Sequence, residues 1–362
     1  MDVITEPAPV RTARRLPGPD VVRAVALIGV VVMNYHGYLV IAGDRTIGGG
    51  FWDEVFHPWS GPLSTRFAAT FVLTAGVGVT LLTRSASDVG ARRWTLLRRG
   101  LALFLFGWFV NHHWPGSILP YYGALFMLAA GLFALPALAV LAIGMTAAVA
   151  GAAIAWWGLE RVIDGHDISW LRAPDRWTSR GLALDTFVNG THPLLPWLMF
   201  FCAGIVLGRL LTKPWWRSLA AGVGLTLFGL ATLISGAIGP SRRADTLAST
   251  DPFDRGLLYT ASALGTALAA FAAVSWLADR WPRHTVVEAF RHAGAMTLTL
   301  YLAHIVVYKI VVDHLGWVRP AGLGAALAFA AVFWLVAIVA AAWYHRRVGI
   351  GPAEWIYRWL GG

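Results

Sequence analysis

The sequence predicts an all-α, polytopic membrane helix bundle with about ten transmembrane helices and both termini in the cytoplasm. Of the 362 residues, 57% are apolar and only 13% are charged, whereas about a quarter of a typical soluble domain is charged. The mean hydropathy is +0.61. The apolar runs are long and continuous, whereas the strands of a lipid-facing β-barrel alternate in character over about ten residues. These features disfavour both an ordinary soluble enzyme and a barrel.

Each predicted helix has about the length that crosses a bilayer, which is about 20 mostly apolar residues. Ten segments fit this description: 20–41, 64–83, 97–113, 117–135, 137–158, 193–211, 217–239, 256–278, 293–313 and 321–345. The third and fourth are the weakest, because they are short and only three residues separate them.

The basic residues predict the orientation of the bundle. The formal charge is +10, which in a soluble chain would suggest nucleic acid. Here the excess of arginine fits the positive-inside rule and anionic lipid headgroups, so no nucleic-acid partner is expected. With the N-terminus inside, 18 of the 29 Lys and Arg residues fall on the inner side. We therefore expect a multi-pass protein of the cell (plasma) membrane.

Three regions are predicted along the chain. Residues 1–19 are expected to form a disordered cytoplasmic tail, and residues 20–345 are expected to form the transmembrane domain. Residues 346–362 form a cytoplasmic interfacial tail, in which Ile356, Trp359 and Leu360 share one face of a helix. The single cysteine excludes an intrachain disulfide and any multi-cysteine metal site, and no metal site is expected.

Polar side chains inside the predicted spans are the functional candidates, because ionisable groups are costly in hydrocarbon. No Asp or Glu falls in the middle of a span, which counts against a coupled transporter. On the first helix, Arg23 and Asn34 lie 11 residues apart and share a face, about 16 Å apart along the axis. That face could hold a phosphate-bearing donor with a long flexible arm. The alternatives are that Arg23 is an anchor paired with Asp20 and that Asn34 bonds a neighbouring helix.

A second candidate is the loop histidine His57. Pro58, Pro62 and Gly61 stiffen and bend its segment, and Trp59 is a candidate substrate contact beside it. An imidazole with an ordinary pKa near 6.5 suits general base catalysis. The alternative is an incidental loop histidine.

Two further histidines are candidate substrate contacts. His113 closes the third predicted helix beside a second histidine, and a position at the membrane interface is the simpler interpretation. His304 shares a helical face with Tyr301 and Tyr308, so these side chains either line a polar cavity or bond neighbouring helices.

Several motifs together resemble a known family. The motifs are Asp20 to Ala24, Asn34-Tyr35, His57 to Gly61, Phe71 to Gly76 and Trp114 to Gly123. They resemble the catalytic domain of heparan-α-glucosaminide N-acetyltransferase. The segments His192 to Trp197 and Gly351 to Trp355 resemble YeiB-like bacterial membrane proteins. One departure is that the usual Arg-Gly pair of the first helix is Arg23-Ala24 here.

The resemblance implies a transmembrane acyltransferase that takes acetyl from cytoplasmic acetyl-CoA and passes it to an acceptor at the outer face. It implies that His57 and Asn34 are the catalytic pair. Arg23, Arg98 and Arg99 are candidates for binding the CoA phosphates, since guanidinium groups match phosphate geometry. For Arg98 and Arg99 the alternative is anchoring at the inner interface.

The expected chemistry is attack by an acceptor amine or hydroxyl on the thioester, with His57 as base and Asn34 at the carbonyl oxygen or the acceptor. An acyl-histidine intermediate stays open. The expected partners are acyl-CoA, membrane lipids and an amino sugar, glycan or lipid-linked acceptor, and a homo-oligomer stays open. The alternative functions are a carrier or flippase for a lipid-linked or amphipathic molecule, and a non-catalytic membrane scaffold.

Overall fold

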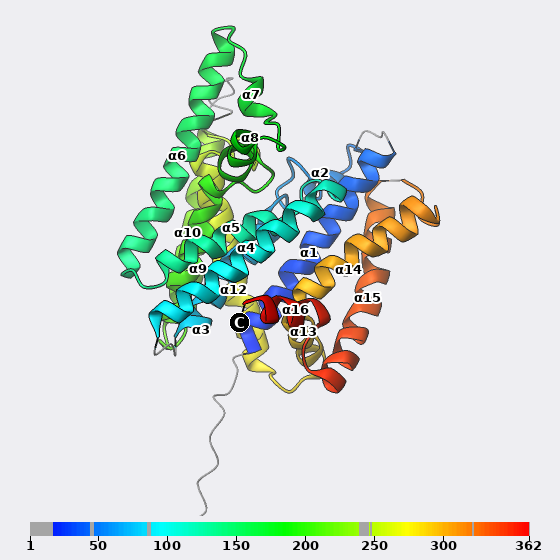
Figure 1. The fold of residues 1–362 in the computed structure, drawn as a ribbon. Helices are drawn as coiled ribbons and strands as arrows, with labels where there is room; N and C mark the ends of the chain where they lie inside the picture. Colours follow the sequence, from blue (N-terminus) through cyan, green and yellow to red (C-terminus); the bar gives the residue numbers. More distant parts are fainter. Residues whose placement is uncertain are drawn as a thin grey trace, which may run out of the picture.

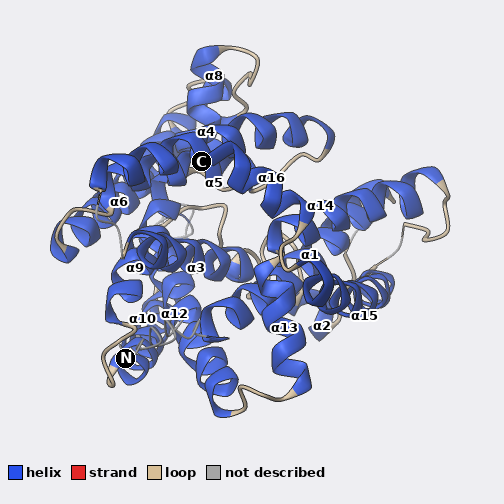
Figure 2. Cartoon of the chain, turned by 60° about the horizontal axis from the view of Figure 1, so that its bottom comes forward, coloured by secondary structure: helices blue, strands red, loops and turns tan. Residues whose placement is uncertain are grey.

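The computed structural model describes residues 17–43, 47–84, 88–238, 246, 248–320 and 322–361. This part of the chain is helical and contains no strand (Figure 2). Most of the predicted tail, residues 1–16, lies outside the described residues. The first helix begins at Pro17, so the last three residues assigned to that tail are already helical.

The helices of the first half begin with the long α1 and end in a group of short helical segments. They are α1 (Pro17–Ala42), α2 (Phe51–Val55), α3 (Arg66–Thr83), α4 (Val89–His113), α5 (Leu119–Leu132), α6 (Ala137–Ile163), α7 (Ser169–Arg172), α8 (Ser179–Leu184) and the π-helical turn η1 (Asp185–Asn189).

The second half contains both long helices and a broken one. Its elements are α9 (Leu194–Leu210), α10 (Trp216–Ala237), α12 (Leu257–Arg280), α13 (Thr285–Ala295), α14 (Thr297–Tyr308), the π-helical turn η2 (Lys309–His314), α15 (Leu323–Val348) and α16 (Pro352–Gly361).

Six helices of the described chain are long and apolar enough to cross a membrane, and the number rises to eight if each of two bent pairs is one span. One pair joins residues 179–189 to α9 at 55°, and the other joins α13 to α14 and η2 at 82°. The predicted count of about ten is therefore not confirmed. Helix α5 has only 14 residues. Helix α4 has 25, but four arginines near its start and three polar residues at its end interrupt its apolar character.

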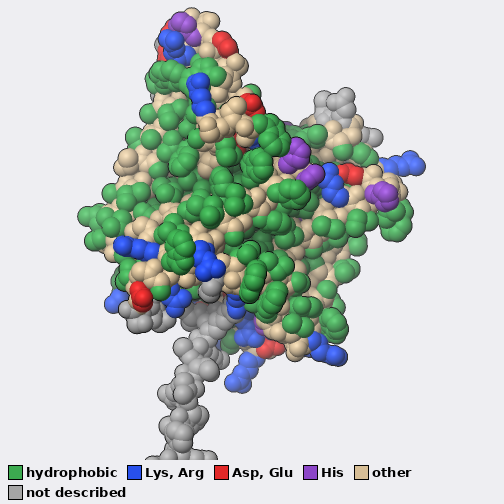
Figure 3. All heavy atoms as spheres, viewed as in Figure 1, with side chains coloured by type: hydrophobic (Ala, Val, Ile, Leu, Met, Phe, Trp, Pro, Cys, Tyr) green, Lys and Arg blue, Asp and Glu red, His purple; other side chains and the backbone are tan. Residues whose placement is uncertain are grey.

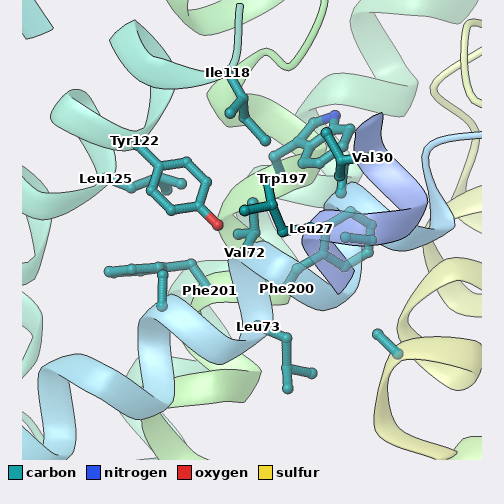
Figure 4. Packing of buried hydrophobic residues seen from close by; sticks show 14 of the residues in the cluster. Leu27, Val30, Val72, Leu73, Ile118, Tyr122, Leu125, Trp197, Phe200 and Phe201 are labelled. Carbon is teal, nitrogen blue, oxygen red and sulfur yellow. The ribbon is translucent and has the colours of Figure 1, made fainter. Parts of the chain in front are cut away.

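One part of the hydrophobic core lies where α1, α3, α5 and α9 meet. Figure 4 shows side chains from all four helices, or from the residue before α5, converging there: Leu27, Val30, Val72, Leu73, Ile118, Tyr122, Leu125, Trp197, Phe200 and Phe201. Close helix approach depends on small residues. A Cβ at Gly204 of α9 would collide with the backbone of Leu73 on α3, so this crossing requires glycine.

Other helices expose their apolar faces. In α10 only 17% of the most apolar window is buried, against 67% in α1. Figure 3 shows hydrophobic side chains over most of the middle of one face, with Lys and Arg gathered at its lower edge, where Figure 1 places α13 and α16. An apolar belt beside a basic edge is typical of a multi-pass membrane protein. We call the end of the bundle where α1 begins and α16 lies the basic end.

Helix α16 lies within the predicted interfacial tail, residues 346–362, and the first three residues of that tail still belong to α15. Ile356, Trp359 and Leu360 are exposed on it. On its opposite side, the Glu354 carboxylate accepts hydrogen bonds from the backbone N–H groups of Leu298 (2.6 Å) and Thr299 (3.2 Å). Glu354 thereby caps the free N-terminus of α14 at the break after α13.

Candidate active site

A cavity of about 660 Å³ lies at the basic end of the bundle. Its charged lining residues are Asp20, Arg23, Arg84, Arg99, Glu354 and Arg358. We call it the basic cavity. The lining also includes apolar and aromatic side chains, Phe71, Leu103 and Tyr122 among them. Four guanidinium groups beside apolar walls fit a ligand that carries phosphates and a long uncharged arm.

Arg23 is held at the wall of this cavity by two bonds. Its guanidinium donates to the Asp20 carboxylate at 3.1 Å and to the carbonyl of Gly294 at 3.2 Å. The Gly294 carbonyl lies at the end of α13, so Arg23 also satisfies the last turn of that half-helix. Arg23 therefore forms the predicted ion pair with Asp20 and also lines the basic cavity.

The two neighbouring arginines of α4 lie in different places. Arg99 lines the basic cavity, and its guanidinium carbon lies 5.6 Å from the centre of the Tyr357 ring. Arg98 is exposed and does not line the cavity. Arg84 and Arg358, which were not among the predicted phosphate contacts, do line it. Their places at the end of α3 and on α16 gave no local signal beyond a basic residue near an interface.

A second cavity, of about 470 Å³, lies farther along α1. Its aromatic lining residues are Tyr38, Trp59, Phe67, Phe253 and Tyr301, and its polar ones are Asn34, Thr65, Arg176, Thr191 and His192. We call it the aromatic cavity. Arg176 is held there by an ion pair with Asp185 at 2.7 Å, which brings the segment after α7 over the cavity. Aromatic walls with scattered polar groups suit a polar organic acceptor.

Asn34 lines the aromatic cavity and is oriented by His304. The His304 Nδ1 contacts the carbonyl oxygen of Tyr301, so Nδ1 carries the hydrogen and Nε2 is the acceptor in the neutral ring. The Asn34 side-chain amide nitrogen lies 3.2 Å from that Nε2 and donates to it. Among the described residues, no hydrogen-bond partner is found for the Asn34 side-chain oxygen or for its second amide hydrogen. His304 itself is fully buried and does not line the cavity.

His57 follows α2 in the loop that leads to α3. Its Nδ1 lies 3.1 Å from the backbone nitrogen of Ser60 and 3.0 Å from the Ser60 hydroxyl. A backbone N–H can only donate, so Nδ1 is the unprotonated nitrogen of the neutral ring. His57 is half-buried. It is not among the lining residues of the aromatic cavity, but the two residues that follow it, Pro58 and Trp59, are.

Contacts with α1 and with α12 fix this loop. His36 of α1 is fully buried and donates from Nδ1 to the carbonyl of Phe56 at 2.8 Å, immediately before His57. At the other end of the loop, Thr65 has a φ of 60°, an unfavourable left-handed conformation for a β-branched residue. The Thr65 hydroxyl lies 2.8 Å from the hydroxyl of Tyr259. The loop that carries His57 is therefore held at both ends.

The structure also brings a carboxylate toward His57 that the sequence did not indicate. Asp251 lies between α10 and α12, within electrostatic reach of His57 and Arg66, and burial raises its pKa above the ordinary value. Arg66 holds this segment by donating to the Thr250 carbonyl at 3.3 Å. No periodicity or motif links residue 251 to residue 57, because the contact depends on the tertiary fold.

His113 lies apart from both cavities. It is exposed at the end of α4, and its ring contacts those of Phe109 and His112. Among the described residues, no group of three or more His, Cys, Asp or Glu side chains is placed to hold a metal ion. The structure thus brings Asn34 and Trp59 to one cavity and Arg23 and Arg99 to the other.

Two family models match the chain. Residues 15–236, more than half of the chain, match the family described as heparan-alpha-glucosaminide N-acetyltransferase, catalytic. The chain belongs to this family. The match includes α1, the His57 loop and the arginines of α4, and it confirms the resemblance that the sequence motifs predicted.

A second family match covers the C-terminal part of the chain and overlaps the end of the first match. Residues 201–361 match a protein family of unknown function, DUF418, which is YeiB-like. No curated protein matches the chain at a significant level. The chain is therefore a multi-pass membrane protein of a transmembrane acyltransferase family.

Proposed function

We propose that the protein transfers an acetyl or other short acyl group from acetyl-CoA, bound in the basic cavity, to an amine or hydroxyl bound in the aromatic cavity. The observation that carries this proposal is the meeting of the two cavities. Each includes Ile118 and Tyr301 in its lining, so the two cavities adjoin at these side chains, and the proposed path from the four arginines to Asn34 crosses there. We further propose that the basic end faces the cytoplasm, in accordance with the positive-inside rule, and that the membrane is the plasma membrane.

The residues of the basic cavity fit the donor. Arg23, Arg84, Arg99 and Arg358 offer guanidinium groups to its phosphates. The cavity volume of about 660 Å³ lies within the ordinary range for small-molecule sites, about 300–1,000 Å³. When bound, the donor supplies an acyl carbon activated by its bond to sulfur.

At the other end of the path, Asn34 is placed to bind the acyl carbonyl oxygen or the acceptor. One amide hydrogen is held by His304, so the second hydrogen is available to the carbonyl oxygen. A well-placed donor of this kind contributes about 10²–10³-fold to a rate.

His57 takes the acceptor's proton at Nδ1, the unprotonated nitrogen of its neutral ring, and gives up the hydrogen bond from the Ser60 backbone N–H as it does so. The Ser60 hydroxyl lies 3.0 Å from Nδ1. The proton therefore either passes through this hydroxyl or comes directly from an acceptor that has displaced the hydroxyl. A bond forms between the acceptor nitrogen or oxygen and the acyl carbon, the carbon–sulfur bond breaks, and the sulfur leaves as a thiol after His57 returns the proton.

A carrier or flippase is the second candidate, and one observation favours it. The two bent helix pairs resemble the discontinuous helices that many transporters use near a substrate site. Such a carrier would move an amphipathic molecule along the same two cavities without changing it.

Transfer of labelled acetyl groups by purified protein separates the two functions. We expect label from acetyl-CoA to appear on at least one member of a panel of amino sugars, glycans and lipid-linked amines. The His57→Ala variant should lose at least about 10²-fold of that rate, and the exposed His166→Ala variant, a matched control, should keep it. Transfer that survives His57→Ala would remove the histidine from the mechanism. Movement of an unmodified solute without transfer would establish the carrier.

A further inference from the structure

Two side chains line both cavities. Among the lining residues of the basic cavity and the aromatic cavity, Ile118 and Tyr301 are the only two in common. Both are almost fully buried, with exposures of 3% and 2%. A group that passes directly from one cavity to the other therefore meets these two residues, which we call the partition.

The two members of the partition come from different parts of the fold and are bonded together. Ile118 immediately precedes α5, and Tyr301 lies in α14. The backbone N–H of Ile118 donates to the Tyr301 hydroxyl at 3.3 Å, and the Ser117 hydroxyl lies 3.1 Å from the same oxygen. The phenol ring is thereby held against the start of α5.

Contacts behind the partition restrict its movement. The Asn111 side-chain oxygen accepts from the backbone nitrogens of Gly116 (2.9 Å) and Ser117 (3.1 Å), which fixes the turn that leads to Ile118. On the other side, the Tyr301 carbonyl is bonded to His304. The Tyr301 side chain is held by the bonds to its hydroxyl, whereas the aliphatic side chain of Ile118 makes no hydrogen bond, so Ile118 is the member of the partition that packing alone positions.

We propose that Ile118 determines which acyl chains reach Asn34, so that a two-carbon group passes Tyr301 and longer linear groups are excluded. This inference rests on the proposed acyl transfer. A branched aliphatic side chain offers the methyl end of a short acyl group an apolar contact, and it occupies the space that further methylene groups would need. One methylene group in such a site changes discrimination by about tenfold or more.

The test compares initial rates of transfer from acetyl-, butyryl- and hexanoyl-CoA. In Ile118→Ala the ratio of butyryl to acetyl transfer should rise by about tenfold or more. The matched control is Ile205→Ala, which removes the same atoms from a fully buried isoleucine of α9 that lines neither cavity. The ratio in this control should equal that of the wild type.

Failure of this inference can be distinguished from failure of the proposed function. A wild-type protein that transfers acetyl, together with an Ile118→Ala variant of unchanged acyl preference, would overturn the partition alone. An equal change in Ile205→Ala would also overturn it, because the effect would then come from loosened packing. A wild type that transfers no acyl group would overturn both proposals. If Ile118→Ala does not fold, Ile118→Val must shift the ratio in the same direction by a smaller factor.

Discussion

In the proposed mechanism, Ser60 relays a proton to His57. Its hydroxyl lies 3.0 Å from Nδ1 and its backbone nitrogen 3.1 Å. Ser60→Ala removes the hydroxyl and keeps the backbone bond that orients the ring, so we expect kcat to fall by about tenfold while KM for acyl-CoA stays the same. Steady-state kinetics with both substrates provide the measurement. A variant with wild-type kcat would show that the acceptor reaches Nδ1 without this hydroxyl.

Asn34 and His304 are expected to act as one unit, because His304 is bonded to Asn34 and does not itself line the aromatic cavity. We expect Asn34→Ala and His304→Phe each to lower the transfer rate, Asn34→Ala by about 10²-fold. The double variant should be no slower than Asn34→Ala, since residues in one network are not additive. Rates of the four proteins form a double-mutant cycle. Fully additive losses would mean that His304 acts independently, as the substrate contact that the sequence suggested.

At the scale of elements, Glu354 attaches α16 to the rest of the bundle. Its carboxylate caps α14 through the backbone nitrogens of Leu298 and Thr299 and accepts from the Thr299 hydroxyl at 2.5 Å. Loss of such a cap costs about 1–2 kcal/mol. Glu354→Ala should lower Tm and speed proteolysis within residues 350–361. The control Glu288→Ala removes an exposed carboxylate from the first turn of α13, and equal effects of both variants would contradict the capping role.

The segment between α10 and α12 should respond to pH through Asp251. Burial raises the pKa of this carboxyl group in the folded chain, so folding favours its neutral form. Its contribution to stability is therefore complete below the pKa of the unfolded chain and is lost as pH rises through the folded pKa. Relative to Asp251→Asn, the wild type should lose Tm as pH rises from about 4 to 7. A difference in Tm that stays constant over this range would contradict the effect.

For the whole molecule, hydropathy predicts the long helices well and the broken ones poorly. Continuous apolar runs identify α10 and α15 because lipid contact requires them. The break between α13 and α14 has no such signal. The Arg23 guanidinium stabilises the break by donating to the carbonyl of Gly294, and the Glu354 carboxylate by accepting from the backbone nitrogens of Leu298 and Thr299. Arg23 and Glu354 both lie far from the break in the sequence.

In the candidate site, too, some residues could be predicted from the sequence and others depend on the tertiary fold. The sequence indicated Asn34 and Trp59, and both line the aromatic cavity, although their roles in catalysis stay predictions. It could not separate Arg98 from Arg99, because adjacent helical residues point about 100° apart and only the packed bundle decides which one faces the cavity. Ile118 gave no chemical signal, since its place follows from two cavities that tertiary contacts create.

The most direct test of the central claim is a sidedness measurement in sealed vesicles that hold the protein in one orientation. Labelled acetyl-CoA is placed on the side of the basic end, and an acceptor from the active panel on the other. We predict that label appears on the acceptor across the membrane with the wild type and not with His57→Ala. Transfer that occurs only when donor and acceptor share one side would contradict a path through the two cavities.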